Sequence, residues 1–338
     1  MKKLSFLILG LLFIPTFLLT SCDRGDDPSS DVVATAKFTI MKDYMVQNNL
    51  DIDKILTNTD GESFVVPAPA SSDLVDAFLS SYYIMDIRSA ADYTTSHVAG
   101  AKNVAFSNIL TEAEKAGTKP ILVVCYTGQT ACYATALLRM YGYSKTRALK
   151  WGMSGWNSST ANSWNNAIGN SASNHINWSY SVAPSNVVYV DPSITSQSSD
   201  GLTILKERVE ATVALGFQTV KGIDVLSSPN NYFINNYFSE TDYLGYGHIA
   251  NAYRIKEDLL LTNNGYLGLN PSANAKVVTY CYTGQTSAVI TACLRVLGYD
   301  AYSLTFGMNG LYNSNPGWGT SPNKWSASMS KNYAIGNN

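Results

Sequence analysis

A six-residue segment occurs twice, unchanged, in this chain of 338 residues. Cys-Tyr-Thr-Gly-Gln-Thr stands at residues 125–130 and again at residues 281–286. Each copy follows a short apolar run, at 121–124 and 277–280, and precedes an apolar helical pattern that ends in Gly-Tyr. The chain is therefore expected to be a tandem duplication in which each half places a cysteine loop between a strand and a helix.

The repeat extends beyond the two cysteine loops. His-Val-Ala-Gly-Ala at 97–101 corresponds to His-Ile-Ala-Asn-Ala at 248–252. Further along, Trp-Gly-Met-Ser-Gly at 151–155 corresponds to Phe-Gly-Met-Asn-Gly at 306–310. These matches lie in the same order in both halves, which favours two units of one fold.

Upstream, the alignment pairs Asp86 with Asp224 as the last residues of equivalent buried strands, so Leu226 takes the place of Arg88. The number of residues between this aspartate and the next histidine is then much larger in the second half. The extra residues fall in an aromatic, Asn-rich stretch, which is expected to be either a lid or interface over the second loop or a decorated surface loop. Its aromatic residues are Tyr232, Phe233, Tyr237, Phe238, Tyr243 and Tyr246.

The predicted fold class is α/β, with two domains that each have a central parallel sheet flanked by helices, because short apolar strands alternate with helical patterns. The clearest predicted helices span 34–47, 129–141, 203–215 and 285–297. The first domain is expected at 34–182, a Pro- and Ser-rich linker at 183–200, and the second domain at 201–338.

The first 21 residues are expected to be a lipoprotein signal peptide. Two lysines precede an apolar stretch over 4–19, and Leu-Thr-Ser-Cys at 19–22 resembles a bacterial lipobox. Cleavage would leave Cys22 as a lipid-bearing N-terminus with a polar tether over 22–33, and would anchor the protein to a bacterial membrane outside the cytoplasm. An uncleaved membrane helix is the alternative, although the apolar run is short for a span.

Composition argues against two classes of partner. The formal net charge is −2 and no basic run occurs, so nucleic-acid binding is not expected. The chain has only three histidines and no Cys-x-x-Cys pair, so no metal site is expected.

Two further cysteines lie in the predicted helices. Cys132 aligns with Ala288, and Cys293 aligns with Leu137. Because each is interchangeable with an apolar residue, both are expected to be small core residues rather than partners in a disulfide.

The cysteine loops have the features of an anion cradle. A cysteine at the carboxyl end of a strand, followed within a few residues by a helix, receives inward-facing amides and the positive end of the helix dipole. Gly128 and Gly284 permit the tight turn, and Thr130 and Thr286 offer hydroxyl donors. A lowered thiol pKa is expected, and the same cradle would hold a persulfide.

The chain resembles the rhodanese (sulfurtransferase) family over roughly 34–165 and 202–315. Four segments carry the resemblance: Asp-Ile-Arg at 86–88, the histidine segment at 97–101, the loop at 125–130, and Gly-Met-Ser-Gly-Trp at 152–156. The resemblance implies an enzyme that moves sulfane sulfur from a donor such as thiosulfate or polysulfide to a thiol or cyanide-like acceptor, without a cofactor.

By this resemblance Cys125 and Cys281 are the catalytic persulfide carriers. Cys125 is favoured, because the second half has lost more of the family pattern. For Arg88 and His97, a structural ion pair or turn is the alternative to a contact with substrate. The predicted substrate-binding residues are Tyr126, Thr127, Gly128, Gln129, Thr130, Tyr282, Thr283, Gly284, Gln285, Thr286 and Arg88.

The loops also depart from related cysteine enzymes. Neither contains Lys or Arg, so efficient use of dianionic thiosulfate is in doubt and the donor stays open. Ala131 and Ser287 stand where a Cys-x5-Arg phosphatase has its arginine, which argues against phosphoryl transfer. The remaining alternatives are a purely structural role, or a carrier or sensor of reactive sulfur or selenium species that docks to a redox protein at the membrane.

Overall fold

The computed structural model describes residues 28–319 and 321–336 and contains two α/β units. The first unit holds a five-stranded sheet in the order β1-β5-β4-β2-β3, with every pair parallel. Its strands are β1 (Val65–Val66), β2 (Tyr83–Asp86), β3 (Lys102–Asn103), β4 (Ile121–Val124) and β5 (Arg147–Leu149). Its helices are α1 (Pro28–Gln47), α2 (Ile52–Leu56), α3 (Val75–Ser80), α4 (Ala90–Thr95), α5 (Ile109–Ala113), α6 (Gln129–Tyr141), α7 (Gly152–Trp156) and α8 (Asn162–Asn165).

The second unit repeats this plan with a four-stranded parallel sheet in the order β7-β11-β10-β8. The predicted α/β class with central parallel sheets is confirmed. The strands are β7 (Thr219–Val220), β8 (Phe233–Asn236), β10 (Val277–Tyr280) and β11 (Ala301–Leu304), and a separate antiparallel pair joins β6 (Trp178–Ser179) to β9 (His248–Ile249). The helices are α9 (Gly201–Leu215), α10 (Gly222–Ser227), α11 (Glu240–Tyr246), α12 (Gln285–Leu297) and α13 (Gly307–Tyr312).

The sequence alignment of one strand was wrong. Asp224 lies in helix α10, and the strand equivalent to β2 is β8, which pairs with β10 as β2 pairs with β4. The true counterpart of Asp86 is therefore Asn236, whose side chain accepts a hydrogen bond from the amide two residues later, as Asp86 does. Arg88 corresponds to Phe238 rather than to Leu226.

The expected insertion in the second half disappears with this correction. The aromatic stretch that begins at Tyr232 forms strand β8 and helix α11, which are ordinary parts of the repeat. Phe238 and Tyr243 are buried within the second unit, so this stretch is neither a lid nor a surface loop. The apolar run beside Asp224 resembled a strand because a short amphipathic helix and a strand share the same residue types.

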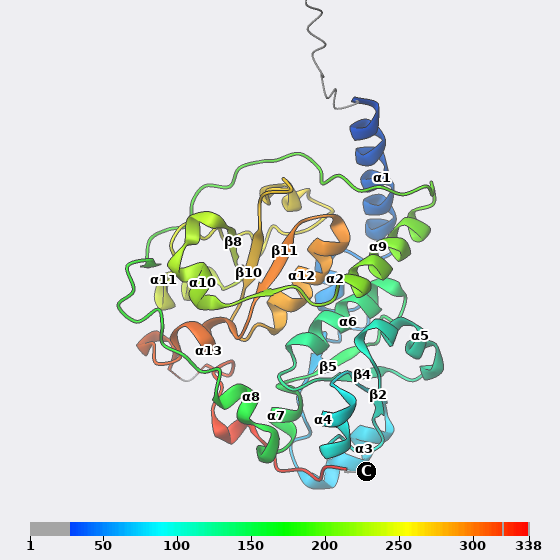
Figure 1. Cartoon of the computed structure of the whole chain (residues 1–338), viewed down its shortest axis with the longest axis vertical. Helices are drawn as coiled ribbons and strands as arrows, with labels where there is room; N and C mark the ends of the chain where they lie inside the picture. The colour runs from blue at the N-terminus through cyan, green and yellow to red at the C-terminus, as the bar shows by residue number, and fades with distance from the viewer. Residues whose placement is uncertain (1–27, 320, 337–338) are drawn as a thin grey trace, which may run out of the picture.

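The two sheets enclose a shared helical layer. One face of β4 contributes Val123 to a core cluster that also contains residues of α1, α6, α9 and α12 and reaches Val277 of β10. The alternate residues of β4, Leu122 and Val124, point into a separate core on the outer face of the first sheet. Figure 1 shows α6 and α12 lying between the sheets. The two units are thus joined by one continuous apolar interior.

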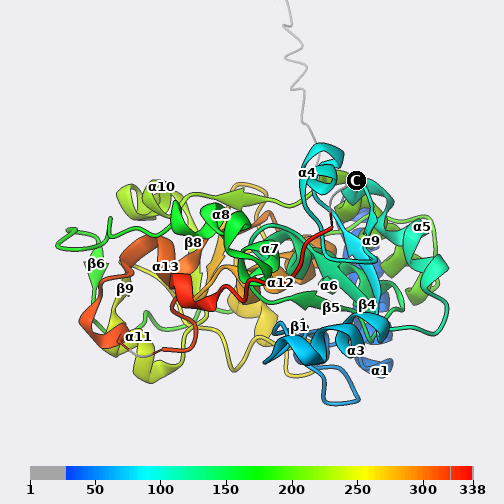
Figure 2. The same ribbon diagram turned by 90° about the horizontal axis from the view of Figure 1, so that it is seen from below.

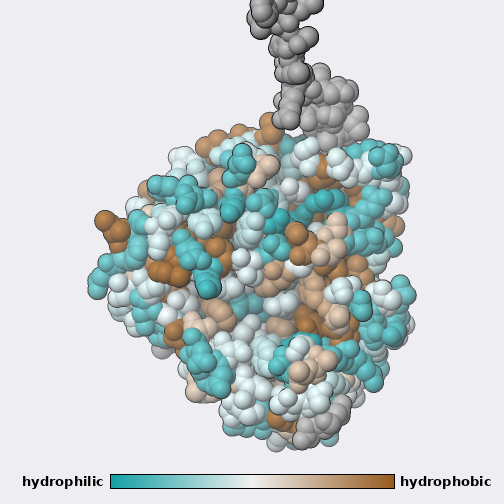
Figure 3. Space-filling view, viewed as in Figure 1, coloured by the Kyte–Doolittle hydropathy of each residue, from teal (hydrophilic) through white to brown (hydrophobic). Residues whose placement is uncertain are grey.

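The segments before and between the units differ in structure. Helix α1, described from Pro28 onward, lies partly inside the segment predicted to be a tether. The linker at 183–200 has no helix or strand and arches over the second unit (Figure 1). Tyr189 and Ile194 hold it to that unit, whereas Val188 and Val190 are exposed. Figure 3 shows apolar patches at the upper margin, where this arch runs.

Each unit extends an arm onto the other. The first arm, residues 166–182, follows α8 and hydrogen-bonds to the second unit through Gly169, Ala172 and the β6–β9 pair. The second arm, residues 325–336, returns to the first unit and hydrogen-bonds to α7 and to His97 (Figure 2). Each arm is therefore the C-terminal extension of one unit in the sequence and packs on the other unit in space.

We predict that Tyr333→Ala lowers the free energy of unfolding by about 3 kcal/mol, because it removes a buried aromatic ring from the second arm. Tyr333 packs against Trp156 at 5.1 Å between ring centroids and donates a hydrogen bond to Pro69. Amide hydrogen exchange should quicken in β2 and β4. Trp178→Ala in the first arm is the matched variant and should quicken exchange in β8 and β10. Faster exchange in the same strands for both variants would contradict the exchange of arms.

Candidate active site

The first cysteine loop joins β4 to α6. Cys125 follows the last residue of β4, and Gly128, with φ of 83°, caps the start of α6. The sulfur of Cys125 accepts hydrogen bonds from the amides of Gly128 at 3.2 Å and Ala131 at 3.4 Å. The side chain is turned toward converging N–H groups, as the sequence predicted, but the residue is only 5% exposed.

The second loop is built alike but holds its sulfur differently. Cys281 accepts one hydrogen bond, from the amide of Ser287 at 3.3 Å, and its thiol lies 3.7 Å from the Ser287 hydroxyl. That hydroxyl also lies 2.8 Å from the hydroxyl of Ser303. Cys281 is 1% exposed. The first loop is therefore the better cradle for an anion, since two amides face its sulfur.

The expectation of a lowered thiol pKa is wrong for Cys125. Burial raises the pKa of this thiol, and the amides of Ala131, Thr127 and Gly128 oppose the increase without cancelling it. The sequence indicated the loop amides, but it did not indicate that other residues of the chain bury the Cys125 sulfur. At neutral pH the free thiol is therefore mostly protonated, and its thiolate fraction grows as the pH rises.

The Gly-Met segments form the floor beneath both loops. In the first unit the amide of Met153 donates to the carbonyl oxygen of Cys125 at 2.8 Å, and in the second the amide of Met308 donates to that of Cys281 at 3.1 Å. A Cβ on Gly152 would lie 2.2 Å from the Cys125 oxygen, so only glycine fits there. The repeated motif thus fixes the backbone of each cysteine from below.

Arg88 takes part in a buried ion pair rather than in an open anion site. Its Nη2 lies 2.6 Å from a carboxylate oxygen of Asp86, and the two side chains are 2% and 0% exposed. The guanidinium also covers the ring of Tyr126, with 4.8 Å from its carbon to the ring centroid. Its Nη1 is buried and has no hydrogen-bond partner among the described residues. Arg88 therefore supports the first loop through Tyr126.

The second unit replaces this charged pair with stacked rings. Phe238 stacks on Tyr282 with ring centroids 4.7 Å apart, and Trp318 also stacks on Tyr282, at 5.9 Å. The Tyr282 hydroxyl donates to Asp242 at 2.6 Å, and burial raises the pKa of this phenol. A neutral aromatic stack thus holds the second loop where an ion pair holds the first.

Gln129 and Gln285 interlock the two loops across the boundary between the units. The Oε1 of Gln129 accepts from the amide of Phe306 at 2.8 Å, and the Nε2 of Gln285 donates to the carbonyl of Thr127 at 3.0 Å. Each side chain occupies the space left by the opposite glycine. A Cβ on Gly128 would lie 2.4 Å from Gln285 Nε2, and one on Gly284 would lie 2.2 Å from Gln129 Oε1.

The structure thus brings the two predicted loops together, although not every predicted contact forms. Thr130 and Thr286 are half-buried, and the described hydrogen bonds to the two sulfurs come from other residues. His97 stacks on Tyr93 and pairs with the second arm, which is a structural role. Cys132 and Cys293 are fully buried core residues with free thiols, as predicted.

Two residues beside the loops were not predicted from the sequence to belong to the site. Trp164 in α8 donates from Nε1 to the carbonyl of Thr127 at 3.1 Å, and its ring stacks on Trp325 of the second arm. Ser287 contacts the Cys281 sulfur in the way described above. Only Ser287 had a signal in the sequence, as the polar residue that aligns with Ala131.

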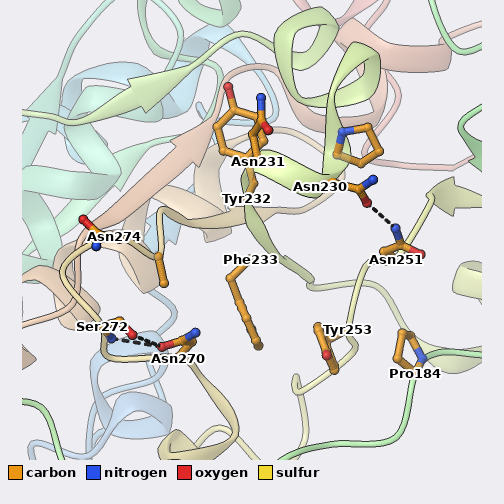
Figure 4. A pocket seen from close by; sticks show the side chains of 12 residues that line it. Pro184, Asn230, Asn231, Tyr232, Phe233, Asn251, Tyr253, Asn270, Ser272 and Asn274 are labelled. Carbon is orange, nitrogen blue, oxygen red and sulfur yellow. Dashed lines mark hydrogen bonds between the residues drawn. The ribbon is translucent and has the colours of Figure 1, made fainter.

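No residue of either cysteine loop lines the open cavity drawn in Figure 4. It has a volume of about 590 Å³ and is lined by aromatic and amide side chains, among them Tyr232, Asn251 and Asn270. Phe233, the first residue of β8, also lines it, so the cavity opens at the amino end of the second sheet. Because β8 and β10 are parallel, Cys281, which follows β10, lies at the carboxyl end of the same sheet.

Within the described residues, no group of three or more His, Cys, Asp or Glu side chains is placed to hold a metal ion. In the same part of the chain, no helix combines the length and apolar character that a membrane crossing requires.

We predict that the buried pair at the first loop is energetically coupled. Arg88→Phe should lower the free energy of unfolding by about 3–5 kcal/mol, because it leaves the Asp86 carboxylate buried and unpaired. The double variant Asp86→Asn with Arg88→Phe has the same two residue types as the second unit at these positions. Its free energy of unfolding should fall by only about 1–2 kcal/mol. Urea unfolding of wild type, Asp86→Asn, Arg88→Phe and the double variant completes the cycle. Additive losses would rule out the coupling.

Comparison with known proteins places these features in a family. The family model described as the rhodanese-like domain matches residues 71–159 and again 223–314. A search among curated proteins gave no match. The chain belongs to the rhodanese family and contains two rhodanese-like domains in tandem.

Solved structures similar to this chain include two sulfurtransferases and a small rhodanese homologue. Thiosulfate sulfurtransferase from Pseudomonas aeruginosa is 13% identical, with a TM-score of 0.28, over 84% of this chain and 49% of that one. 3-Mercaptopyruvate sulfurtransferase from Leishmania major is 13% identical, with a TM-score of 0.27, over 74% of each chain. A rhodanese homologue from the extremely thermophilic bacterium Thermus thermophilus is 24% identical, with a TM-score of 0.21, over 26% of this chain and 94% of that one.

Proposed function

We propose that this protein is a sulfurtransferase that carries sulfane sulfur on Cys125 as a persulfide. The observation that carries the proposal is the pair of amide hydrogen bonds to the Cys125 sulfur, from Gly128 and Ala131, at the start of α6. Amide donors favour negative charge on sulfur and are suited to a persulfide, whose outer sulfur is anionic. Membership of the rhodanese family supports the same chemistry.

The proposed reaction has two displacements. Cys125 loses its proton to solvent, and the thiolate attacks the outer sulfur of a donor such as polysulfide or thiosulfate. The sulfur–sulfur bond of the donor breaks, and the shortened polysulfide or sulfite leaves with the electron pair. A thiol or cyanide-like acceptor then attacks the outer sulfur of the Cys125 persulfide, which regenerates the thiolate.

The first loop offers no unpaired cation to bind a donor of high negative charge. No cationic side chain lies in either loop, and the Arg88 charge is compensated by Asp86. A thiosulfate dianion would therefore have only amides and hydroxyls to bind. A protein persulfide, which carries at most one charge on its outer sulfur, suits this loop better than thiosulfate, so we propose to compare it and polysulfide with thiosulfate as donors.

The burial of Cys125 favours one alternative within the same chemistry. A sulfur that is only 5% exposed exchanges slowly with small acceptors in solution. The protein would then be a carrier or sensor of reactive sulfur or selenium species that passes its cargo to a docked redox protein. The two functions differ in turnover, since the carrier would be persulfidated once and would release sulfur only to its partner.

We predict that Cys125→Ser lowers sulfur transfer from polysulfide to cyanide by at least about a thousandfold, because it removes the proposed nucleophile. Cys281→Ser should cause a smaller loss, since one amide rather than two faces that sulfur. Cys293→Ala, a change in the buried core of α12, is the control and should keep full activity. Measurable turnover by Cys125→Ser would contradict the assignment. No turnover by the wild type, with one sulfur bound at Cys125, would favour the carrier.

We also propose that the protein is lipid-anchored through Cys22 on the extracytoplasmic side of a bacterial membrane. The support is the lipobox-like sequence at 19–22, which lies outside the described residues. In cells fed labelled palmitate, the wild type should carry label and sediment with membranes, and Cys22→Ala should do neither. Retention of Cys22→Ala in the membrane fraction would favour an uncleaved membrane helix instead.

A further inference from the structure

The peptide group between Thr127 and Gly128 is held from both sides. Its carbonyl oxygen accepts two hydrogen bonds, from Gln285 Nε2 at 3.0 Å and from Trp164 Nε1 at 3.1 Å. Its N–H, on Gly128, donates to the Cys125 sulfur at 3.2 Å. One peptide plane therefore connects the second cysteine loop to the reactive sulfur of the first.

The geometry of the peptide bond makes this connection directional. A trans peptide is planar, so its C=O and N–H point in opposite directions, and the described chain contains no cis peptide bond. Fixing the oxygen of Thr127 toward Gln285 and Trp164 therefore fixes the Gly128 hydrogen toward Cys125. Without these hydrogen bonds the peptide plane could rotate away from Cys125, because glycine has the widest range of backbone dihedral angles.

The two hydrogen bonds from Gln285 and Trp164 form a clamp on the Thr127 carbonyl. This clamp depends on a close approach of Gln285 to residue 128, which only glycine allows. Gln285 Nε2 would lie 2.4 Å from a Cβ on Gly128, so a side chain there would exclude it. Gln285 itself is 3% exposed and begins helix α12. Its orientation follows from chemistry, because a carbonyl oxygen can only accept and the amide nitrogen must donate.

We propose that Gln285 and Trp164 are positioning residues that aim the Gly128 amide at the Cys125 sulfur. This inference deepens the proposed function and rests on it. It assigns to the second cysteine loop a task that does not require chemistry at Cys281. Gln285 supports sulfur chemistry in the first unit from across the boundary between the units.

The clamp acts in one direction. Gln129 is the counterpart of Gln285, yet its Oε1 accepts from the amide of Phe306, which lies outside the second loop. The described hydrogen bonds include none from Gln129 to the carbonyl of Thr283. The asymmetry matches the number of amides at the two sulfurs, two at Cys125 and one at Cys281.

The test is the pH dependence of Cys125 alkylation by iodoacetamide, followed by peptide mapping of the full chain. Gln285→Met keeps the length of the side chain and removes the donor, and Trp164→Phe keeps an aromatic ring and removes the other donor. Each variant should alkylate about fivefold more slowly at mildly alkaline pH, with its profile moved to higher pH, because a misaimed amide stabilises the thiolate less. Thr262→Val is the matched control, since it breaks a hydrogen bond between the units at Asp51.

Profiles of folded Gln285→Met and Trp164→Phe that superimpose on the wild type would overturn the inference. An equal shift in Thr262→Val would also overturn it, because general loosening would then explain the effect. Circular dichroism establishes folding, and Trp164→Phe preserves the test if Gln285→Met is unfolded. The assay does not need sulfur transfer. A shift in a protein that turns over no sulfane donor would therefore refute the proposed function and leave the positioning role intact.

Discussion

The close contact between the two cysteine loops is the constraint on which the site depends. Glycine precedes α6 and α12, and each glycine leaves room for the glutamine of the other loop. The loops can therefore meet at the boundary of the units, where Gln285 bonds to Thr127 and Gln129 bonds to Phe306. The shared core between the sheets and the exchange of arms hold the units in the alignment that this contact needs.

Two opposing effects set the chemistry of the Cys125 sulfur. Burial raises the pKa of the thiol, whereas the loop amides favour the anion. In the resting protein burial wins, so the amides do not produce a thiolate by themselves at neutral pH. They are better suited to a persulfide, because the charge then lies on an outer sulfur and a persulfide is more acidic than a thiol. Under the proposed function, these amides would stabilise a transferred sulfur more than they would activate the bare cysteine.

The sequence predicted what local signals determine. Both helices after the loops have the predicted limits, because a left-handed glycine lies just before each of them and Gly142 or Gly298 lies just after. The prediction that Asp224 ends a strand was wrong, since a short apolar run does not show whether the segment forms a helix or a strand. The exchanged arms and the role of Gln285 could not be predicted, because both depend on contacts between residues far apart in the chain. The sequence also could not show how deeply Cys125 is covered.

The most direct test of the account is a crystal structure of the wild-type protein after treatment with polysulfide. We expect one additional sulfur on Cys125, surrounded by the amides of residues 126–130 and the amide of Ala131. The carbonyl of Thr127 should stay bonded to Gln285. An unmodified Cys125 in protein that has taken up sulfur elsewhere would contradict the account, as would an additional sulfur that points away from the loop amides.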